Sequence, residues 1–406
     1  MDKEADQAST TVCPRARIGA SLLAQTAIPH NLQEVNEMIY IGLDVHKSYC
    51  VATAIDKRGK EIGIHRFPTD KRAIEAYINY LPKAEKQAVV EASTMMYPVY
   101  RVLEEAGVKT KVANPLKVKA IASAKIKTDK IDSKTLAHLL RAKLIPECYI
   151  PSNAVRELRK LCRHRVSLNK QRTHTKNSIH ALLAEQDVKH SFSDLFGSGG
   201  RAFLDSLRLS KETQIILNTQ LAVLDVLNKQ IEEVSKHIAE TALIDKNAKL
   251  LMSIPGIGYY TALTIVSEIG DIKRFESDKQ LCSWAGLVPS TYQSGQHTYH
   301  GRITKQGNKM VRWVLVQATQ QTVRYENPLT KHFEKVRARK DRNKAIVATA
   351  RKMLMIMYAM LSKQEAYWYA DEGLIKRKEE HTRLTAQIYL KRPFKKRVIG
   401  TSQSLS

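Results

Sequence analysis

The segment from Met38 to Asp44 constrains the fold more than any other part of the chain. Its residues, MIYIGLD, form an apolar run that ends in an acid, which is typical of a buried strand. Four more strand patterns follow, at residues 50–56, 62–67, 87–91 and 109–113. Helical patterns alternate with the later strands, at residues 70–81, 96–106, 115–124 and 129–143. This order, a three-stranded meander followed by strand–helix–strand units, predicts a mixed sheet covered by helices.

Carboxylates stand at the ends of two of these strands. Asp44 ends the first strand, and Glu91 ends the strand QAVVE. A carboxylate in that position is costly to bury unless it is paired or bound to a metal. Asp129 and Asp132 lie three residues apart at the start of a predicted helix, so they project from one face, although helix capping alone would also explain an acid there. Four converging carboxylates would repel one another, and hard oxygen ligands indicate a divalent cation, Mg²⁺.

The chain carries a large excess of positive charge. Its 66 Lys and Arg outnumber 40 Asp and Glu, which gives a formal net charge of +26. Such an excess indicates a polyanionic partner such as nucleic acid. Basic residues are densest in a helical stretch at 152–190, where Arg165 and Arg172 are candidate phosphate contacts and a solvated helix face is the alternative. A loop rich in glycine and serine is expected at residues 197–200.

Apolar residues recur at seven-residue intervals between residues 212 and 242. The repeat consists of Leu217, Leu224, Ile231 and Ile238, with Leu221 and Asn228 at the intervening positions. The pattern predicts a coiled-coil arm that joins protomers into a homodimer or tetramer, and a polar Asn at such a seam often fixes the register. Packing of this helix within one monomer is the alternative.

A further unit, mainly helical, is expected from about residue 246. Pro255, Gly256 and Gly258 form a tight turn between two helical segments, which resembles a helix-hairpin-helix motif. Such a turn exposes backbone N–H groups that can bind a DNA phosphate, whereas a plain helical hairpin would have only a structural role. Three basic residues downstream are further candidate phosphate contacts: Arg302, Lys305 and Arg312.

The cysteines and the chain ends indicate the cellular compartment in which the protein is expected. The five cysteines are odd in number and form no paired C-x-x-C, so we expect reduced thiols in a cytoplasm. The N-terminus opens with the acidic MDKEADQ and no run of about 18 apolar residues occurs, which argues against export and against a membrane span. Residues 1–37 are expected to form a disordered extension, and residues 364–406 a basic tail.

Several short sequence segments, spread over roughly residues 38–360, resemble those of one known protein family. YIGLDVHK, VANP and KTDKIDSKTLA are similar to the RuvC-like, RNase H-type domain of the DEDD insertion-sequence transposases, the bridge-RNA-guided recombinases. AGLVP, QSG, GRITKQGN and VRWVL resemble the C-terminal transposase domain of the same family. The resemblance implies a catalytic domain at 38–150, a basic helix and coiled-coil arm at 151–245, and a transposase domain at 246–363.

The resemblance also implies an activity. It makes Asp44, Glu91, Asp129 and Asp132 the ligands of a catalytic Mg²⁺ and makes Ser294, otherwise an ordinary turn residue, the nucleophile. It further implies cleavage and rejoining of DNA in a bacterial mobile element, a guide RNA encoded by the element, and an active site shared between protomers.

Two other functions remain open at this stage. A RuvC-like junction resolvase or nuclease would cut with metal-activated water and would not use Ser294. A non-catalytic nucleic-acid scaffold would use its acids only for capping and pairing. His297 and His300 have no spacing typical of metal ligands, and no His or Lys stands at a local spacing that marks it as the base for Ser294.

Overall fold

The computed structural model describes residues 38–122, 128–294 and 297–387. The chain divides into two compact units, Met1–Ile150 and Pro151–Ser406. The expected N-terminal extension at 1–37 and residues 388–406 of the tail expected at 364–406 lie outside the described residues. Residues 372–387 of that expected tail form a helix instead.

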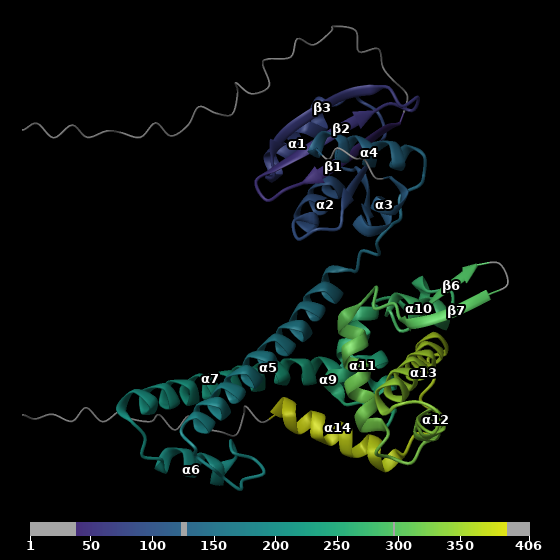
Figure 1. Cartoon of the computed structure of the whole chain (residues 1–406). Coiled ribbons are helices and arrows are strands. Elements are labelled where there is room, and N and C mark those ends of the chain that lie inside the picture. The colour runs from purple at the N-terminus through teal and green to yellow at the C-terminus, as the bar shows by residue number, and fades with distance from the viewer. Residues whose placement is uncertain (1–37, 123–127, 295–296, 388–406) are drawn as a thin grey trace, which may run out of the picture. The chain divides into compact units, whose positions relative to one another are not determined.

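Unit 1 contains a five-stranded sheet with the order β3-β2-β1-β4-β5 (Figure 1). Its strands are β1 (Ile39–Val45), β2 (Tyr49–Ile55), β3 (Glu61–Pro68), β4 (Lys86–Glu91) and β5 (Lys109–Ala113). β1 pairs antiparallel with β2 and parallel with β4, so the sheet is mixed as the sequence predicts. Each strand begins and ends within one residue of its predicted bounds.

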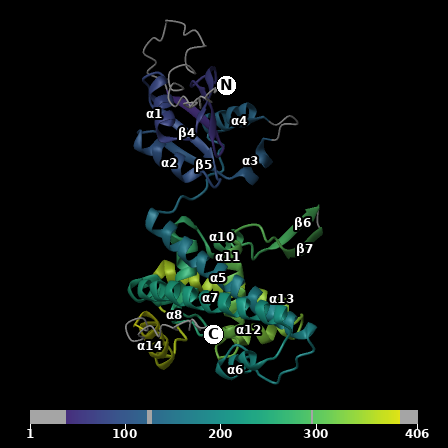
Figure 2. The same cartoon turned by 90° about the vertical axis from the view of Figure 1, so that its left-hand side faces the viewer.

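Helices cover both faces of this sheet (Figure 2). They are α1 (Lys71–Tyr80), α2 (Met96–Glu105), α3 (Pro115–Ile121) and α4 (Asp129–Arg141). Ile41 and Leu43 of β1 pack with α1 and α2 in one buried cluster. Because side chains alternate along a strand, Gly42 and Asp44 point to the opposite face, against which α4 packs.

Gly42 allows α4 to approach β1 very closely. A Cβ atom at this position would lie 2.5 Å from the amide nitrogen of Ala137 and would also overlap the carbonyl oxygen of Ser133. The hydroxyl groups of Thr53 on β2 and Ser133 on α4 form a buried hydrogen bond of 2.8 Å. The first turns of α4 are therefore held tightly against the end of the sheet where β1 terminates.

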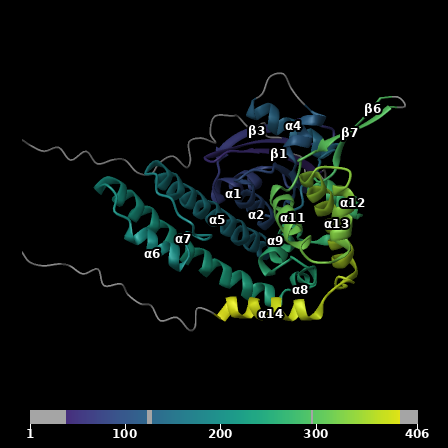
Figure 3. The same cartoon turned by 60° about the horizontal axis from the view of Figure 1, so that its bottom comes forward.

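In unit 2 two long helices, α5 (Asn153–Glu185) and α7 (Lys211–Ile244), lie side by side (Figure 3). The short helix α6 (Ser198–Ser206) stands between them in sequence. The prediction of a loop at residues 197–200 is wrong from Ser198 on, because α6 begins there. Gly200 makes this possible: a Cβ atom would lie 2.6 Å from the Cα atom of Leu195, so only glycine lets the helix pack on that backbone.

The seven-residue seam of α7 is used within the chain. Leu217, Leu221 and Leu224 are buried with Ile179 and Leu183 of α5. Asn228 is exposed, and its neighbour Leu227 takes the buried position instead. The prediction that this seam joins protomers is therefore wrong, and the alternative, packing within one monomer, is confirmed.

The rest of unit 2 is a helical assembly with one β-hairpin. Its elements are α8 (Lys246–Met252), α9 (Tyr259–Ile269), the 3-10 helix η1 (Ile272–Arg274), α10 (Asp278–Trp284), β6 (Pro289–Ser294), β7 (His297–Ile303), α11 (Lys309–Thr322), α12 (Pro328–Arg337), α13 (Arg342–Lys363) and α14 (Glu372–Gln387). The β6–β7 hairpin projects from the helices around it (Figures 1 and 3). The main core includes Ile238 and Ala242 of α7, so residues on both sides of the boundary predicted near 245 share one core.

Helix α13 is long and apolar enough, by length and composition alone, to cross a membrane. Its side chains Met353, Leu354 and Met357 are buried in the core that includes α9, α10 and α11. The apolar sequence of α13 is thus accounted for by packing within unit 2.

A buried carboxylate ties α5 to this core. Glu268 of α9 is fully buried and accepts two hydrogen bonds from Arg163 on α5, at 2.6 and 2.8 Å. Asn308, the N-cap residue of α11, donates a third at 2.7 Å, and Nε of Arg159 lies 3.6 Å away. Two arginines of the basic helix therefore have an internal partner.

Candidate active site

The two strand-end acids lie beside each other in the sheet. β1 and β4 pair in parallel with Leu43 opposite Val90, so the next positions along the two strands are Asp44 and Glu91. Residues at matched positions of neighbouring strands point to the same face. Both carboxylates therefore belong to the face that α4 covers.

The other two acids occupy the first turn of α4. Asp129 is its first residue and Asp132 follows three residues later, after the N-cap Thr128, whose hydroxyl accepts a hydrogen bond from the amide of Ile131. The positive end of the helix dipole favours acids here. The hydroxyl of Tyr49 on β2 donates to Oδ2 of Asp129 at 3.0 Å, which fixes that carboxylate toward the sheet.

The charges of three acids act on one another. Burial raises the pKa of Asp44 above its ordinary value, while the nearby His46 opposes the shift. The negative charges of Asp129 and Asp132 raise the pKa of Asp44 further. Acids that are far apart in sequence are thus close enough in space to oppose each other's ionisation, which is the arrangement that a bound cation relieves.

His46 belongs to this cluster, although the sequence analysis did not single it out. Its Nε2 lies 3.2 Å from Oδ2 of Asp44 and 3.4 Å from Oδ2 of Asp129. This nitrogen is buried, and both of its near neighbours are carboxylate oxygens of the cluster. The spacing Asp-x-His at the end of a strand could have revealed it, since residues two apart share a face of the strand.

The donor atoms fit a metal ion. Asp44, His46 and Asp129 each offer one ligand atom, and these atoms lie within 4.8 Å of one another. Carboxylate oxygens suit Mg²⁺, Ca²⁺ and Mn²⁺, whereas an imidazole nitrogen suits transition metals. The acidic cluster is therefore a candidate site for a divalent cation.

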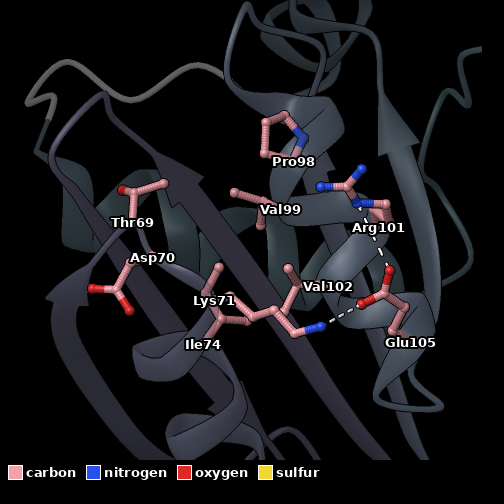
Figure 4. Close-up of a pocket in the computed structure, with 9 residues that line it drawn as sticks. All are labelled: Thr69, Asp70, Lys71, Ile74, Pro98, Val99, Arg101, Val102 and Glu105. Atoms are coloured by element: carbon pink, nitrogen blue, oxygen red, sulfur yellow. Dashed lines mark hydrogen bonds and ion pairs between the residues drawn. The ribbon is translucent and has the colours of Figure 1, made fainter.

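Unit 1 also contains a cavity that none of these acids lines. It is a cavity of about 180 Å³ between α1 and α2, with Ile74, Val99 and Val102 among its lining residues (Figure 4). At its rim Lys71 donates to Glu105 at 2.8 Å. Its volume is below that of ordinary small-molecule sites, and none of the four acids lines it.

Two of the predicted phosphate contacts make internal contacts instead. Arg165 donates to the hydroxyl of Ser235 at 2.6 Å, and its guanidinium lies 4.0 Å from the ring centre of Tyr260. Arg312 donates to the carbonyl oxygen of Ala285 at 2.8 Å. Both side chains therefore hold helices of unit 2 together. Among the other predicted contacts, Arg302 and Lys305 are exposed and Arg172 is half-buried.

The predicted tight turn lies between α8 and α9. Gly256 has a φ of +82°, and a Cβ atom there would lie 2.6 Å from the amide nitrogen of Thr322. Glycine is therefore needed here so that the turn can pack against the backbone at Thr322. Gly258 is the N-cap of α9, and a Cβ atom at this position would meet no other atom within 4 Å. Lys378 of α14, which the sequence analysis did not single out, donates to the carbonyl oxygens of Met252 and Ile254, both at 2.7 Å.

We expect Lys378→Met to destabilise unit 2 by about 1–3 kcal/mol, because two buried carbonyl groups would lose their donor. Burial lowers the pKa of Lys378 to about 8, which is consistent with an ammonium group largely removed from water. Urea unfolding of the two proteins measures the difference. Lys376→Met, at an exposed position of the same helix, is the matched control. Equal unfolding midpoints for the two variants would show that Lys378 does not hold the turn.

Ser294 is the last residue of β6 and is exposed. It stands in a strand, not in a turn as its sequence context alone suggests, and it pairs across the hairpin with His297. Ser294 belongs to unit 2, whereas the four acids belong to unit 1.

Two family models match the chain. One describes the DEDD transposases of the IS110 type and covers residues 41–186. The other is described as the IS116/IS110/IS902 transposase family and covers residues 248–335. The chain belongs to this family of transposases. It is thus a DNA recombination enzyme, and DNA is its partner.

Relatives that match most of the chain include two named as transposases and one named as a gene-inverting protein. The transposase for insertion sequence element IS1111A of Coxiella burnetii is 27% identical over 351 residues, which span 82% of this transposase and 93% of that protein. A probable family 20 transposase of Pseudomonas aeruginosa is 24% identical over 80% of this chain and 98% of its own length. The pilin gene-inverting protein of Moraxella bovis is 28% identical over 64% of this chain and 74% of its own length.

Proposed function

We propose that this transposase cuts and rejoins DNA with Ser294 as the nucleophile and with a divalent cation held by its acidic cluster. The observation that carries the proposal is the convergence of Asp44, Asp129 and a buried ring nitrogen of His46 in a member of a transposase family. Glu91, beside Asp44 in the sheet, and Asp132, beside Asp129 on α4, complete the ligand set.

Unit 1 would act as an RNase H-like catalytic domain. Its mixed sheet, with acids at the ends of β1 and β4 and at the start of α4, is compatible with that fold. When bound, Mg²⁺ supplies positive charge that stabilises the phosphate and the leaving oxygen. The protein's own contribution is to fix the carboxylates: Tyr49 orients Asp129, and the contact at Gly42 holds α4 against β1.

Ser294 would attack the DNA phosphate and form a phosphoserine link. That link conserves the energy of the broken phosphodiester, which allows the strand to be rejoined. Its exposure at the end of β6 leaves its hydroxyl accessible to a polymer. Because Ser294 and the acids belong to different units, we propose that one active site combines units from two protomers of a dimer or tetramer.

A guide RNA encoded by the element would select the DNA target. The net charge of +26 suits the binding of both nucleic acids. The exposed Arg302 and Lys305, together with the turn at Gly258, would contact phosphates in the manner of a helix-hairpin-helix motif. Arg165 and Arg312 are left out of this surface because their guanidinium groups bind within unit 2.

The test is chemical. The transposase is incubated with the element's RNA, Mg²⁺ and a labelled DNA site, and denaturing gels are searched for a protein–DNA adduct. We expect an adduct in the parent and none in Ser294→Ala or Asp129→Asn. If Ser294→Ala cuts DNA as fast as the parent and neither forms an adduct, the enzyme is a nuclease that uses water.

A further inference from the structure

The β6–β7 hairpin gathers four side chains on one face. Its strands pair with Ser294 opposite His297 and with Tyr292 opposite Tyr299. Residues directly opposite each other in an antiparallel pair share a face, and so do residues two apart on one strand. The Cβ atoms of such opposite pairs lie about 4.5–5.5 Å apart. A serine hydroxyl and an imidazole can meet in a hydrogen bond across this distance.

This face is open to solvent. Ser294 and His297 are exposed, and the exposed fractions of Tyr292 and Tyr299 are 67% and 69%. The hairpin projects from the helices of unit 2, as Figures 1 and 3 show. Two neighbouring tyrosine rings without a core beneath them suit stacking on nucleobases, and the exposed Arg302 on β7 suits a phosphate.

We propose that His297 is the catalytic base and acid for Ser294, and that Tyr292 and Tyr299 hold the DNA strand against this pair. The proposal rests on the proposed function, in which Ser294 is the nucleophile. His297 would supply the base that a serine needs at neutral pH, since the hydroxyl group is a weak nucleophile without a neighbouring base. Sequence spacing does not point to His297, because the two residues are brought together by strand pairing.

The imidazole of His297 takes the proton of the Ser294 hydroxyl while the Ser294 Oγ forms a bond to the DNA phosphorus. The bond from phosphorus to the deoxyribose oxygen breaks, and that oxygen keeps the electron pair and takes a proton from water. In rejoining, a deoxyribose hydroxyl attacks the phosphoserine and loses its proton to water, while the imidazolium of His297 returns its proton to Ser294 Oγ as the new phosphodiester forms.

The experiment measures the rate of adduct formation in a single turnover of the full-length transposase with its RNA, Mg²⁺ and labelled DNA. We expect His297→Ala to slow the adduct by about 10²- to 10⁴-fold, the usual effect of a positioned acid–base group, with DNA binding and melting temperature unchanged. Added imidazole should restore a large part of the rate. His300→Ala, which removes an imidazole three residues further along β7, is the matched control and should react at the parental rate.

Other outcomes would contradict either the role of His297 or the proposed function itself. Adduct formation by His297→Ala at the parental rate overturns the role of His297 and leaves Ser294 as the nucleophile. A slow His297→Ala that imidazole does not restore, but that His297→Gln does, also overturns it, because the residue would then only support the hairpin. DNA cleavage by Ser294→Ala at the parental rate, with no adduct in the parent, contradicts the proposed function itself.

Discussion

Asp44→Asn is expected to abolish DNA cleavage without destabilising the metal-free protein. The loss should be on the order of 10³-fold or more, because the variant lacks a charged ligand at the centre of the cluster. The folded state raises the pKa of Asp44 through burial and through the charges of Asp129 and Asp132, so the ionised carboxylate is less stable there than in the unfolded chain. The neutral amide of Asn removes the free-energy cost of holding an ionised carboxylate at this position in the folded state.

Thermal unfolding with and without Mn²⁺ or Mg²⁺ separates the two effects. The parent should gain melting temperature on addition of metal, because a ligand that binds only the folded state stabilises it. Asp44→Asn should show no such gain and should melt no lower than the parent when metal is absent. The control is Glu75→Gln, at a side chain of α1 that is 41% exposed and outside the cluster. A metal-induced gain in Asp44→Asn equal to that of the parent would contradict the assignment of Asp44 as a ligand.

Glu268→Ala is expected to cause a large loss of stability in unit 2. The change leaves Arg163, Arg159 and Asn308 without the buried carboxylate that they contact. Removal of one partner of a buried ion pair costs about 3–5 kcal/mol, and we expect the lower end, because the Arg163 side chain is 50% exposed and can regain water.

Urea unfolding monitored in the helical signal measures this effect. Glu157→Ala is the control, since Glu157 is an exposed acid of α5 that contacts only Lys160 among the ion pairs found there. That variant should lose less than about 1 kcal/mol. Similar losses in the two variants would mean that the buried carboxylate does not hold α5 on the core.

Much of unit 1 could be predicted from the sequence because its signals are local. The apolar run before Asp44 and the alternation of strands and helices predict all five strands, and Asp44 and Glu91 stand out because strands end in them. Their meeting in space is also predictable, since parallel neighbouring strands end at the same edge of a sheet.

What the sequence did not predict depends on contacts between distant segments. The spacing of His46 from Asp44 was a weak signal, and its place in the cluster becomes clear when α4 brings Asp129 within 3.4 Å of its ring. Arg165 and Arg312 look like phosphate contacts until Ser235 and Ala285 are seen to accept their hydrogen bonds. The heptad repeat of α7 was read correctly as a seam, but periodicity cannot tell a helix of the same chain from one of another protomer.

The contact at Gly42 has a consequence for ion selectivity. Asp44 stands two residues after Gly42 on β1, and Asp129 lies on the helix that rests against Gly42. In the proposed cation site, the separation of β1 and α4 would therefore limit how closely Asp44 and Asp129 can approach one ion. Mg²⁺ holds its ligands at about 2.1 Å and Ca²⁺ at about 2.3–2.6 Å. Discrimination by ionic radius at the proposed site would thus depend on the backbone contact at Gly42, a residue that has no side chain.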